Sequence, residues 1–361
     1  MSSINKNNPL HRSGSEKGGN RRIWTTVFKI VIPLVITVGL CWQLFSSVDF
    51  NEMLAIIRKN CDYRWIVAAL LLSILSHVFR AMRWRIQLRA IGVNPPLFAL
   101  VLSLFGTYAV NLVFPRLGEL WRTGYISQRQ DAPFDSVFGS MVADRLADTV
   151  TVALITLVTF LLAGGPLIAF VTGVGNRQMI EKAIGLLSSP WTYVGIAAAA
   201  TIIWIGTRLM RHTSFWNKAA GFCRGLWKGF AVVATMPGRG RWLILTACIW
   251  GCYFLQLYVA FFAFPATAQV VAHYGAGAVM ICFVLSSISM IVPSNGGIGP
   301  WQQAIVFGLS IYAAGIPELT RAYAISFANL VMGSQTLLLI ALGLFTFICI
   351  AADRRRNRAL T

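Results

Sequence analysis

Residues 137–163 read VFGSMVADRLADTVTVALITLVTFLLA, an apolar stretch that nevertheless holds Asp144, Arg145 and Asp148. A membrane-spanning helix needs about 20 mainly apolar residues. At 1.5 Å per residue, the three charges lie roughly 10 to 17 Å along such a helix from Val137, near the middle of the bilayer. Left unpaired there, they would cost roughly 8 to 10 kcal/mol, about what the apolar neighbours return. The stretch therefore predicts a membrane helix whose charges are paired inside a helix bundle.

The composition of the whole chain supports the same class. Of 361 residues, 57% are hydrophobic and 12% are charged, and the mean hydropathy is +0.67, whereas soluble domains carry about 25% charged residues. A soluble globular protein, a disordered chain and a secreted disulfide scaffold are excluded. The formal net charge of +19 is typical of basic cytosolic loops in a membrane protein, and we expect no nucleic-acid partner. The predicted fold class is an all-α, polytopic integral membrane helix bundle.

Apolar windows of suitable length recur along the chain. Six are predicted to be full spans, near residues 24–45, 65–88, 137–163, 191–208, 242–264 and 322–351. Three more lie near residues 97–114, 274–292 and 301–315. A single transmembrane domain is thus expected over residues 24–351, between basic cytosolic tails at residues 1–23 and 352–361. The first tail has no apolar core, so a cleavable signal peptide is not expected.

Basic residues predict the orientation, because segments rich in Lys and Arg stay in the cytosol. Five precede the first window, seven lie from Arg208 to Arg241, and four end the chain. Four more close the second window and are assigned to the cytosol with them: Arg80, Arg83, Arg85 and Arg89. The near-neutral segments 46–64 and 164–190 are then external. Both termini are expected in the cytosol.

Two stretches begin and end on the same side and are predicted to be re-entrant hairpins. The first holds the apolar run Leu97–Phe114, the turn Pro115–Glu119 and a polar return. The second, over residues 265–318, joins two apolar arms through Pro293–Pro300 and enters from the opposite side. Irregular backbone at membrane depth is tolerated only inside protein or beside water. Both turns are therefore expected to line one cavity.

The two hairpins occupy equivalent places in a predicted internal repeat. The pattern Pro115-x-x-Gly118 recurs as Pro293-x-x-Gly296. Each hairpin stands between two full spans, so the repeat halves cover about residues 65–163 and 242–350 with opposite orientations. An inverted repeat of this kind is typical of transporters, whose substrate sites lie between broken helices.

The charges of residues 137–163 form the first candidate site. Asp144 and Asp148 share a helix face at i, i+4, and Arg145 reaches Asp148 at i, i+3. An ionic cluster that faces the interior of the bundle is expected. Two explanations remain open: a functional cavity, and a pair of ions that only locks two helices together.

The first hairpin turn supplies four further candidates, namely Asn111, Arg116, Glu119 and Arg122. Glu119 and Arg122 are three residues apart and so lie one turn from each other on a short helix. Free backbone N–H groups at the start of that helix, together with guanidinium groups, suit a phosphate headgroup. The alternative is that Arg116 and Arg122 extend to the membrane interface and bind nothing.

The second hairpin turn carries backbone donors and an amide but no charge. Its candidate residues are Asn295, Gly296 and Gly297. They could position a headgroup, or they could form only a tight turn.

No constellation in the sequence points to a catalytic or metal site. The four His are scattered without metal-binding spacing, and there is neither a Gly-x-Ser-x-Gly elbow nor a P-loop. Most of the seven Cys lie in apolar stretches and show no paired spacing. We expect no metal, no cofactor and no catalytic residue.

Three motifs follow one another in the chain: Asn111–Arg122 (NLVFPRLGELWR), Asp144–Asp148 (DRLAD) and Pro293–Gly299 (PSNGGIG). In this order they resemble the lysylphosphatidylglycerol synthase transmembrane region, or flippase-like domain family, over about residues 25–350. That family usually has Glu where this chain has Asp144. The resemblance implies a membrane part that moves aminoacylated or other anionic lipids between leaflets, with some members linked to polyprenyl or hopanoid lipids.

Bifunctional members of that family add a soluble cytosolic domain that transfers lysine from its tRNA to phosphatidylglycerol. This chain ends at Thr361, shortly after its last span. The soluble domain and its synthase activity are therefore expected to be absent.

The leading prediction is a lipid transporter of the bacterial inner (plasma) membrane that binds the phosphate-bearing headgroup of an anionic or aminoacylated lipid. Arg116, Arg122 and Arg145 would bind the headgroup, and the nearby carboxylates would balance them. One alternative is an intramembrane transferase that acts on a lipid carrier. Another is a non-catalytic subunit that recruits a soluble synthase through the basic segment 208–241.

Overall fold

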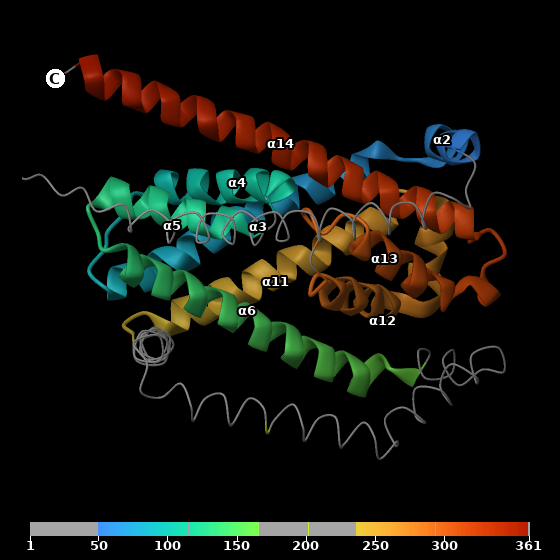
Figure 1. The fold of residues 1–361 in the computed structure, drawn as a ribbon. Coiled ribbons are helices and arrows are strands. Elements are labelled where there is room, and N and C mark those ends of the chain that lie inside the picture. The colour runs from blue at the N-terminus through green and yellow to red at the C-terminus, as the bar shows by residue number, and fades with distance from the viewer. Residues whose placement is uncertain (1–49, 115, 166–200, 202–235, 293, 360–361) are drawn as a thin grey trace, which may run out of the picture.

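The computed structural model describes residues 50–114, 116–165, 201, 236–292 and 294–359, and every regular element in these ranges is a helix (Figure 1). In chain order the elements are α2 (Phe50–Asn60), α3 (Tyr63–Ala90), α4 (Leu97–Val113), α5 (Leu117–Gln130), α6 (Phe134–Ala163), α11 (Arg239–Phe261), α12 (Pro265–Ser289), α13 (Pro300–Ser310), the 3₁₀ turn η1 (Ala313–Gly315) and α14 (Arg321–Ala359). Of these, α3, α6, α11, α12 and α14 are long and apolar enough to cross a membrane. The predicted all-α polytopic membrane bundle is confirmed.

Four of the six predicted spans fall within the described residues, where they form α3, α6, α11 and α14. The windows near residues 24–45 and 191–208 and the tail 1–23 lie outside the described residues, apart from Thr201. The element that differs most from the sequence prediction is α12, which begins at Pro265, before the apolar window expected near residues 274–292. Its 25 residues are enough for a span, but its backbone breaks at Gly275, with φ 70° and ψ −169°, a conformation that only Gly adopts readily.

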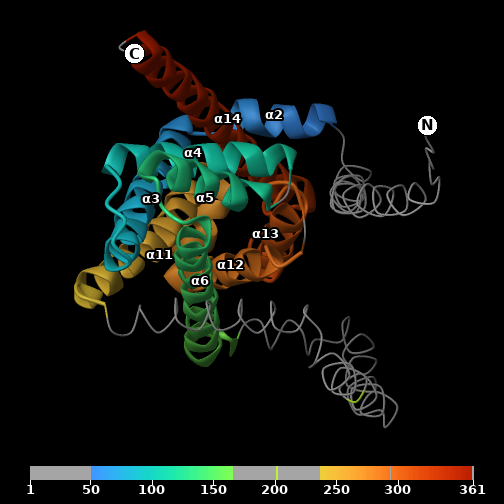
Figure 2. The ribbon, with the colours of Figure 1, turned by 60° about the vertical axis from the view of Figure 1, so that its left-hand side comes forward.

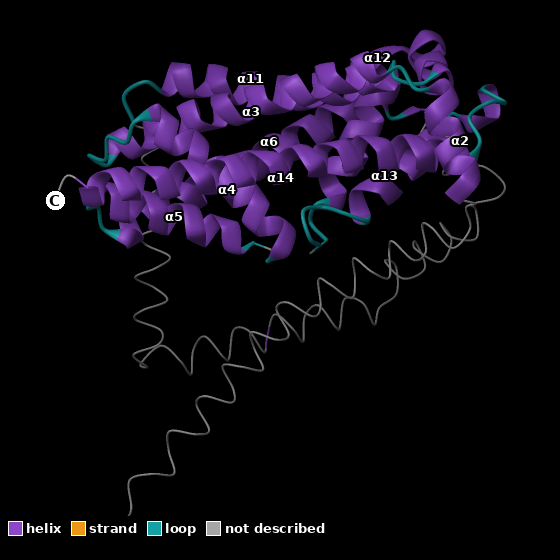
Figure 3. Ribbon diagram, turned by 90° about the horizontal axis from the view of Figure 1, so that it is seen from above, coloured by secondary structure: helices purple, strands orange, loops and turns teal. Residues whose placement is uncertain are grey.

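The helices lie side by side; loops lie at both ends of the bundle, and the turns before α5 and α13 lie between these ends (Figure 3). α3 and α11 pack closely along each other. α6 and α14 lie on opposite sides of the bundle and run in opposite directions (Figures 1 and 2). The C-terminal ends of α3, α5 and α14 and the N-terminal end of α11 lie together at the left in Figure 1. Basic residues such as Arg89, Arg129 and Arg239 therefore share one end.

Helix packing follows the predicted repeat, in which α3, α4, α5 and α6 correspond to α11, α12, α13 and α14. α4 packs on α5 as α12 packs on α13, and α5 packs on α6 as α13 packs on α14. Between the halves, α6 packs on α12 and α14 packs on α4. Exchanging each helix for its counterpart in the other half turns the α6–α12 contact into the α14–α4 contact. The inverted repeat itself stays a prediction.

The outer side of α6 is apolar, as expected of a helix that faces lipid. Leu157, Leu161 and Leu162 are 56%, 76% and 83% exposed. The charged face of the same helix is turned inward, with Asp144 fully buried. The helix thus follows the predicted division between a lipid-facing side and a charged interior side.

The tips of the two hairpins meet beside α4. In the first turn, Gly118 packs so closely on α4 that a Cβ would overlap the Thr107 carbonyl oxygen. In the second, Gly296 has φ 64°, and a Cβ there would overlap Leu112. Both turns thus depend on glycine at a point of close approach. Their proximity agrees with the expectation that they line one region, and the re-entrant arrangement remains a prediction.

Candidate functional site

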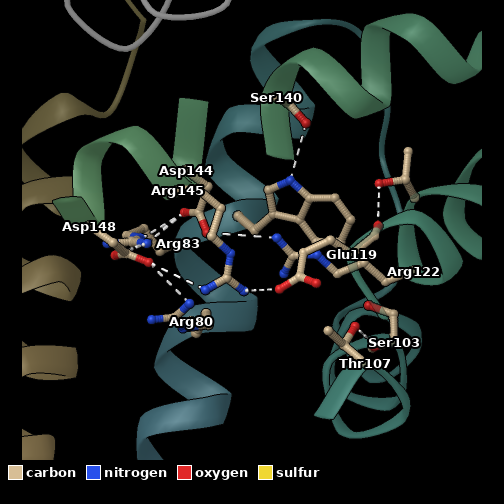
Figure 4. Close-up of polar contacts among 12 residues, drawn as sticks. Arg80, Arg83, Ser103, Thr107, Glu119, Arg122, Ser140, Asp144, Arg145 and Asp148 are labelled. Atoms are coloured by element: carbon tan, nitrogen blue, oxygen red, sulfur yellow. Dashed lines mark hydrogen bonds and ion pairs between the residues drawn. The ribbon is translucent and has the colours of Figure 1, made fainter. Parts of the chain in front are cut away.

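An ionic cluster lies between α3, α5 and α6 (Figure 4). Arg83 of α3 donates from Nε to Asp144 Oδ1 at 2.9 Å and from Nη2 to Asp148 Oδ1 at 2.7 Å. Its Nη1 also donates to the Thr246 hydroxyl of α11 at 3.3 Å. Arg83 and Asp144 are fully buried. Arg83 therefore joins Asp144 and Asp148 of α6 to α3 and α11.

Asp148 is shared by three arginines. Arg80 Nη1 lies 3.0 Å from Asp148 Oδ2, and Arg145 Nη1 lies 3.8 Å from the same oxygen. The Arg80 guanidinium also lies over the Tyr253 ring, 5.8 Å from its centroid. The predicted i, i+3 contact between Arg145 and Asp148 is present, but it is longer than the contacts that α3 provides.

The structure corrects the assignment of Arg80 and Arg83 to the cytosolic basic residues. Their exposed fractions are 3% and 0%, and both bind the carboxylates of α6. Two buried carboxylates need close cations, and Arg145 alone does not supply them. The available signal was spacing: Arg80 and Arg83 are three apart on one face of α3, together with the buried Trp84.

Arg122 is held in a different way. It is fully buried, and its guanidinium lies 4.4 Å from the centroid of the Trp84 ring. Trp84 is fixed in turn because its Nε1 donates to the Ser140 hydroxyl at 3.1 Å. The closest carboxylate oxygen, Asp144 Oδ2, lies 3.9 Å from Arg122 Nη2. None of the three guanidinium nitrogens of Arg122 has a hydrogen-bond partner in the described part of the chain.

Glu119 faces Arg145, not Arg122. Its Oε1 lies 3.6 Å from Arg145 Nη2, and Asn111 Nδ2 donates to its Oε2 at 3.2 Å. Asn111 is oriented because its Oδ1 accepts from the Gly118 backbone N–H at 2.8 Å. Glu119 and Arg122 lie one turn apart on α5, but Asn111 orients Glu119 toward Arg145 of α6.

The cluster carries one surplus positive charge. Four guanidinium groups, on Arg80, Arg83, Arg122 and Arg145, face the three carboxylates of Glu119, Asp144 and Asp148. The side chains of Arg145 and Glu119 are 32% and 21% exposed, whereas the others are nearly or fully buried. The cluster is thus accessible at the Arg145–Glu119 edge and holds its least satisfied cation, Arg122, inside.

Six of the predicted site residues come together in this cluster: Asn111, Glu119, Arg122, Asp144, Arg145 and Asp148. Arg116 does not join them. It is exposed, has φ 64°, and forms no hydrogen bond or ion pair with any residue the structure describes. Asn295, Gly296 and Gly297 lie at the second hairpin tip, and Gly296 approaches Leu112 rather than a charged side chain.

His77 is a further polar residue of α3, one turn before Arg80. The structure places it in the interior, 4% exposed, with its ring 4.6 Å from the Tyr108 ring. Neither ring nitrogen has a hydrogen-bond partner within the described ranges. His77 and Arg80 thus lie on the same interior side of α3.

One ion pair joins the first hairpin to α14 at the surface. Arg129 Nη1 donates to Asp353 Oδ2 at 2.6 Å, and both side chains are more than a third exposed. That hydrogen bond raises the pKa of Arg129 above its ordinary value. Arg129 therefore stays positively charged at physiological pH.

The described residues contain no group of three or more His, Cys, Asp or Glu side chains that could hold a metal ion. The charged side chains of the cluster are guanidinium and carboxylate groups. Guanidinium forks bind carboxylate and phosphate through paired N–H groups.

Fold and cluster together define a polytopic helical membrane protein with an ionic site in its interior. The chain belongs to the lysylphosphatidylglycerol synthase TM region family, whose sequence model matches residues 30–343. The predicted family is thereby confirmed.

Two relatives are similar over part of their lengths. The glycosyltransferase AglD of Haloferax volcanii is 24% identical over 325 residues, which cover 83% of this chain and 51% of that protein. The UPF0104 membrane protein MJ1595 of Methanocaldococcus jannaschii is 22% identical over 134 residues, 36% of this chain and 40% of that protein. The chain thus spans about half the length of the first relative and less of the second.

Proposed function

We propose that this protein moves a lipid with an anionic headgroup between the leaflets of a cell membrane. The observation that carries the proposal is Arg122, a fully buried guanidinium without a hydrogen-bonded acceptor among the described residues. A buried cation whose N–H groups have no hydrogen-bond acceptor is costly. A phosphate oxygen would satisfy its N–H groups and neutralise the surplus charge of the cluster.

The route to Arg122 begins at the partly exposed edge of the cluster. Arg145 contacts Glu119 and Asp148 only at 3.6 and 3.8 Å, longer than the 2.7–2.9 Å of a strong charge-assisted hydrogen bond. A headgroup phosphate would first meet Arg145 and then reach Arg122. Arg80 and Arg83, which bind Asp148 and Asp144 at 3.0 and 2.7 Å, would hold the site open as a fixed frame.

The helix packing supports a proposed orientation and a proposed mechanism. The basic end of the bundle would face the cytosol. The exchange of contacts between halves supports an inverted repeat, which would allow the site to face either side in turn. A soluble synthase that supplies the lipid would be recruited through the basic segment 208–241.

A second candidate function is an intramembrane transferase acting on a lipid carrier. It is favoured by the name of one relative, glycosyltransferase AglD, of which this chain spans about half. Glu119, the accessible carboxylate of the cluster, would serve as the base in such a reaction.

Reconstitution into vesicles tests the proposal. Purified protein is incorporated into vesicles that carry fluorescent phosphatidylglycerol or, separately, fluorescent phosphatidylcholine, and dithionite bleaches the outer leaflet. We expect exchange of the anionic lipid well above the rate in protein-free vesicles and above that of phosphatidylcholine. Equal rates with and without protein would reject transport. Transfer of a labelled sugar from a nucleotide donor to a polyprenyl phosphate by the same preparation would establish the second candidate.

A further inference from the structure

The last three turns of α3 have two faces that both carry arginine. Arg80 and Arg83 lie on the buried face with Trp84. At 100° per residue, Arg85 and Arg89 lie on the opposite face, and both are at least partly exposed. These two arginines therefore do not belong to the ionic cluster.

A pocket of about 340 Å³ lies on this outer face, between α3, α11 and the start of α4. We call it the α3–α11 groove. Its apolar lining comes from Met82, Ile86, Leu97, Ile244 and Leu245. Met82 and Ile244 are 38% and 64% exposed. The groove thus presents apolar surface to the outside of the bundle, beside the long helices that form its walls.

Arg85, Arg89 and Arg241 also border the groove, mainly through the carbon atoms of their side chains, and no carboxylate lies among the residues that border it. Arg85 is anchored because its Nε donates to the Pro95 carbonyl oxygen at 3.1 Å. The two Nη atoms of its guanidinium take no part in that hydrogen bond. Three positive charges without a compensating carboxylate are complementary to an anion.

Two of the three arginines lie at the basic end of the groove, and the residue that lies farthest from that end along α3 is apolar. Arg89 lies in the last turn of α3 and Arg241 in the first turn of α11, at the basic end of the bundle. Met82 lies seven residues before Arg89, roughly 10 Å deeper along the helix. A phospholipid has the same order, with a phosphate at the surface and an acyl chain below it.

We propose that the α3–α11 groove binds an anionic phospholipid of the leaflet at the basic end. The phosphate contacts Arg85, Arg89 and Arg241, and the first part of an acyl chain lies on Met82, Ile86 and Ile244. This binding site is separate from the cluster around Arg122, because the two lie on opposite faces of α3. It holds a resident lipid, which stabilises the packing of α3 on α11.

Lipid retention by the purified full chain tests the proposal. Native mass spectrometry is recorded after titration with phosphatidylglycerol or phosphatidylcholine. The test variant is Arg85→Gln/Arg89→Gln/Arg241→Gln, and the matched control is Arg58→Gln/Lys59→Gln/Arg64→Gln, which removes the same charge from exposed residues at the other end. We expect the test variant to bind phosphatidylglycerol roughly a hundredfold more weakly, since each interfacial basic residue contributes about fivefold. The control should bind like the wild type.

A second variant keeps the charge and removes the space. Ile244→Trp fills the groove and should also reduce phosphatidylglycerol retention, whereas an excess of inorganic phosphate should not displace the lipid. Displacement by phosphate would indicate a free-anion site and overturn the proposal. Unchanged retention in the triple variant, or equal retention of phosphatidylcholine by the wild type, would overturn it as well. Arg122→Gln should leave this binding intact, so the groove and the proposed transport are tested separately.

Discussion

The last long helix of each half, α6 in the first and α14 in the second, contacts its neighbours through a different kind of polar interaction: ion pairs for α6 and neutral hydrogen bonds for α14. In the first half, α6 carries Asp144 and Asp148 and is joined to α3 by arginines. In the second half, α14 carries amides at the positions where it meets its neighbours. Gln335 accepts from Gln256 of α11 at 3.0 Å and donates to Ser73 of α3 at 2.8 Å.

The amide contacts continue toward the second hairpin. Gln302 of α13 donates to Asn329 of α14 at 3.1 Å, and its Oε1 accepts from the Gly299 backbone N–H at 2.6 Å. Each of these contacts is neutral and completed within the protein. The ionic cluster, by contrast, retains a surplus positive charge and an unbonded guanidinium. On the proposed function, the charged half would bind the lipid headgroup, whereas the neutral half holds its helices together through completed hydrogen bonds.

Removing Asp144 should have the largest effect on the molecule. Asp144→Asn removes one of the two carboxylates that bind Arg83 and the carboxylate nearest to Arg122, and leaves these buried guanidinium groups under-compensated, at a cost of about 3 to 5 kcal/mol. We expect loss of monodisperse protein in size-exclusion chromatography and a large fall in melting temperature. Asp135→Asn, an exposed position in the first turn of the same helix, is the matched control. Equal stability of the two variants would show that the charged half is not more strongly coupled than the neutral half.

Gly118→Ala should open the first hairpin. The added Cβ overlaps the Thr107 carbonyl oxygen, and crowding of this kind costs roughly 1 to 3 kcal/mol. Gly124→Ala on the same helix meets nothing within 4 Å and should be neutral or slightly stabilising. Thermal unfolding of both variants in detergent measures the difference. The same melting temperature for both would argue against the close packing of α5 on α4.

Gln335→Leu tests the neutral half. The change leaves Gln256 and Ser73 without their partner, which should cost about 1 to 2 kcal/mol. Lipid exchange in vesicles should remain, because no charge is lost. Gln130→Leu, the same substitution at the exposed end of α5, is the control. If Gln335→Leu abolished exchange while the protein stayed folded, the second half would belong to the binding site.

The pair Arg129–Asp353 should contribute least. Both groups are exposed, so Arg129→Ala should lower stability by about 0 to 1 kcal/mol. Melting temperatures at low and high salt provide the measurement. A loss as large as that of Asp144→Asn would mean that the surface link between the halves matters as much as the buried cluster.

The helical membrane class and most site residues could be predicted from sequence, because charges inside an apolar segment must be paired. Asp144 and Asp148 indicated an interior cluster on these grounds. Their main partners could not be identified, since Arg80 and Arg83 lie near the end of an apolar segment, where arginine is usually at the interface. Helical spacing separates them from Arg85 and Arg89, but only the structure shows which of the two faces of α3 is buried.

The amide network was missed for a related reason. Gln and Asn carry no charge, so they give no strong signal in an apolar helix. Their role becomes visible only when Gln335 and Asn329 meet partners from other helices. Arg116 shows the converse: a charged residue in a recognisable motif that the backbone directs away from the site.

The most direct measurement compares lipid exchange by Arg122→Gln, Arg122→Lys and Arg116→Gln in reconstituted vesicles. Arg122 has no hydrogen-bonded partner to leave unpaired among the described residues, so its removal should cost the contact with the Trp84 ring, about 1 kcal/mol, and the long ion pair with Asp144 at 3.9 Å. Phosphatidylglycerol exchange should fall at least about tenfold, since hydrogen bonds to charged groups contribute about 1.5 to 3 kcal/mol. Lysine should restore little, because it lacks the guanidinium fork, and Arg116→Gln should exchange lipid like the wild type. Full exchange by folded Arg122→Gln protein would contradict the account.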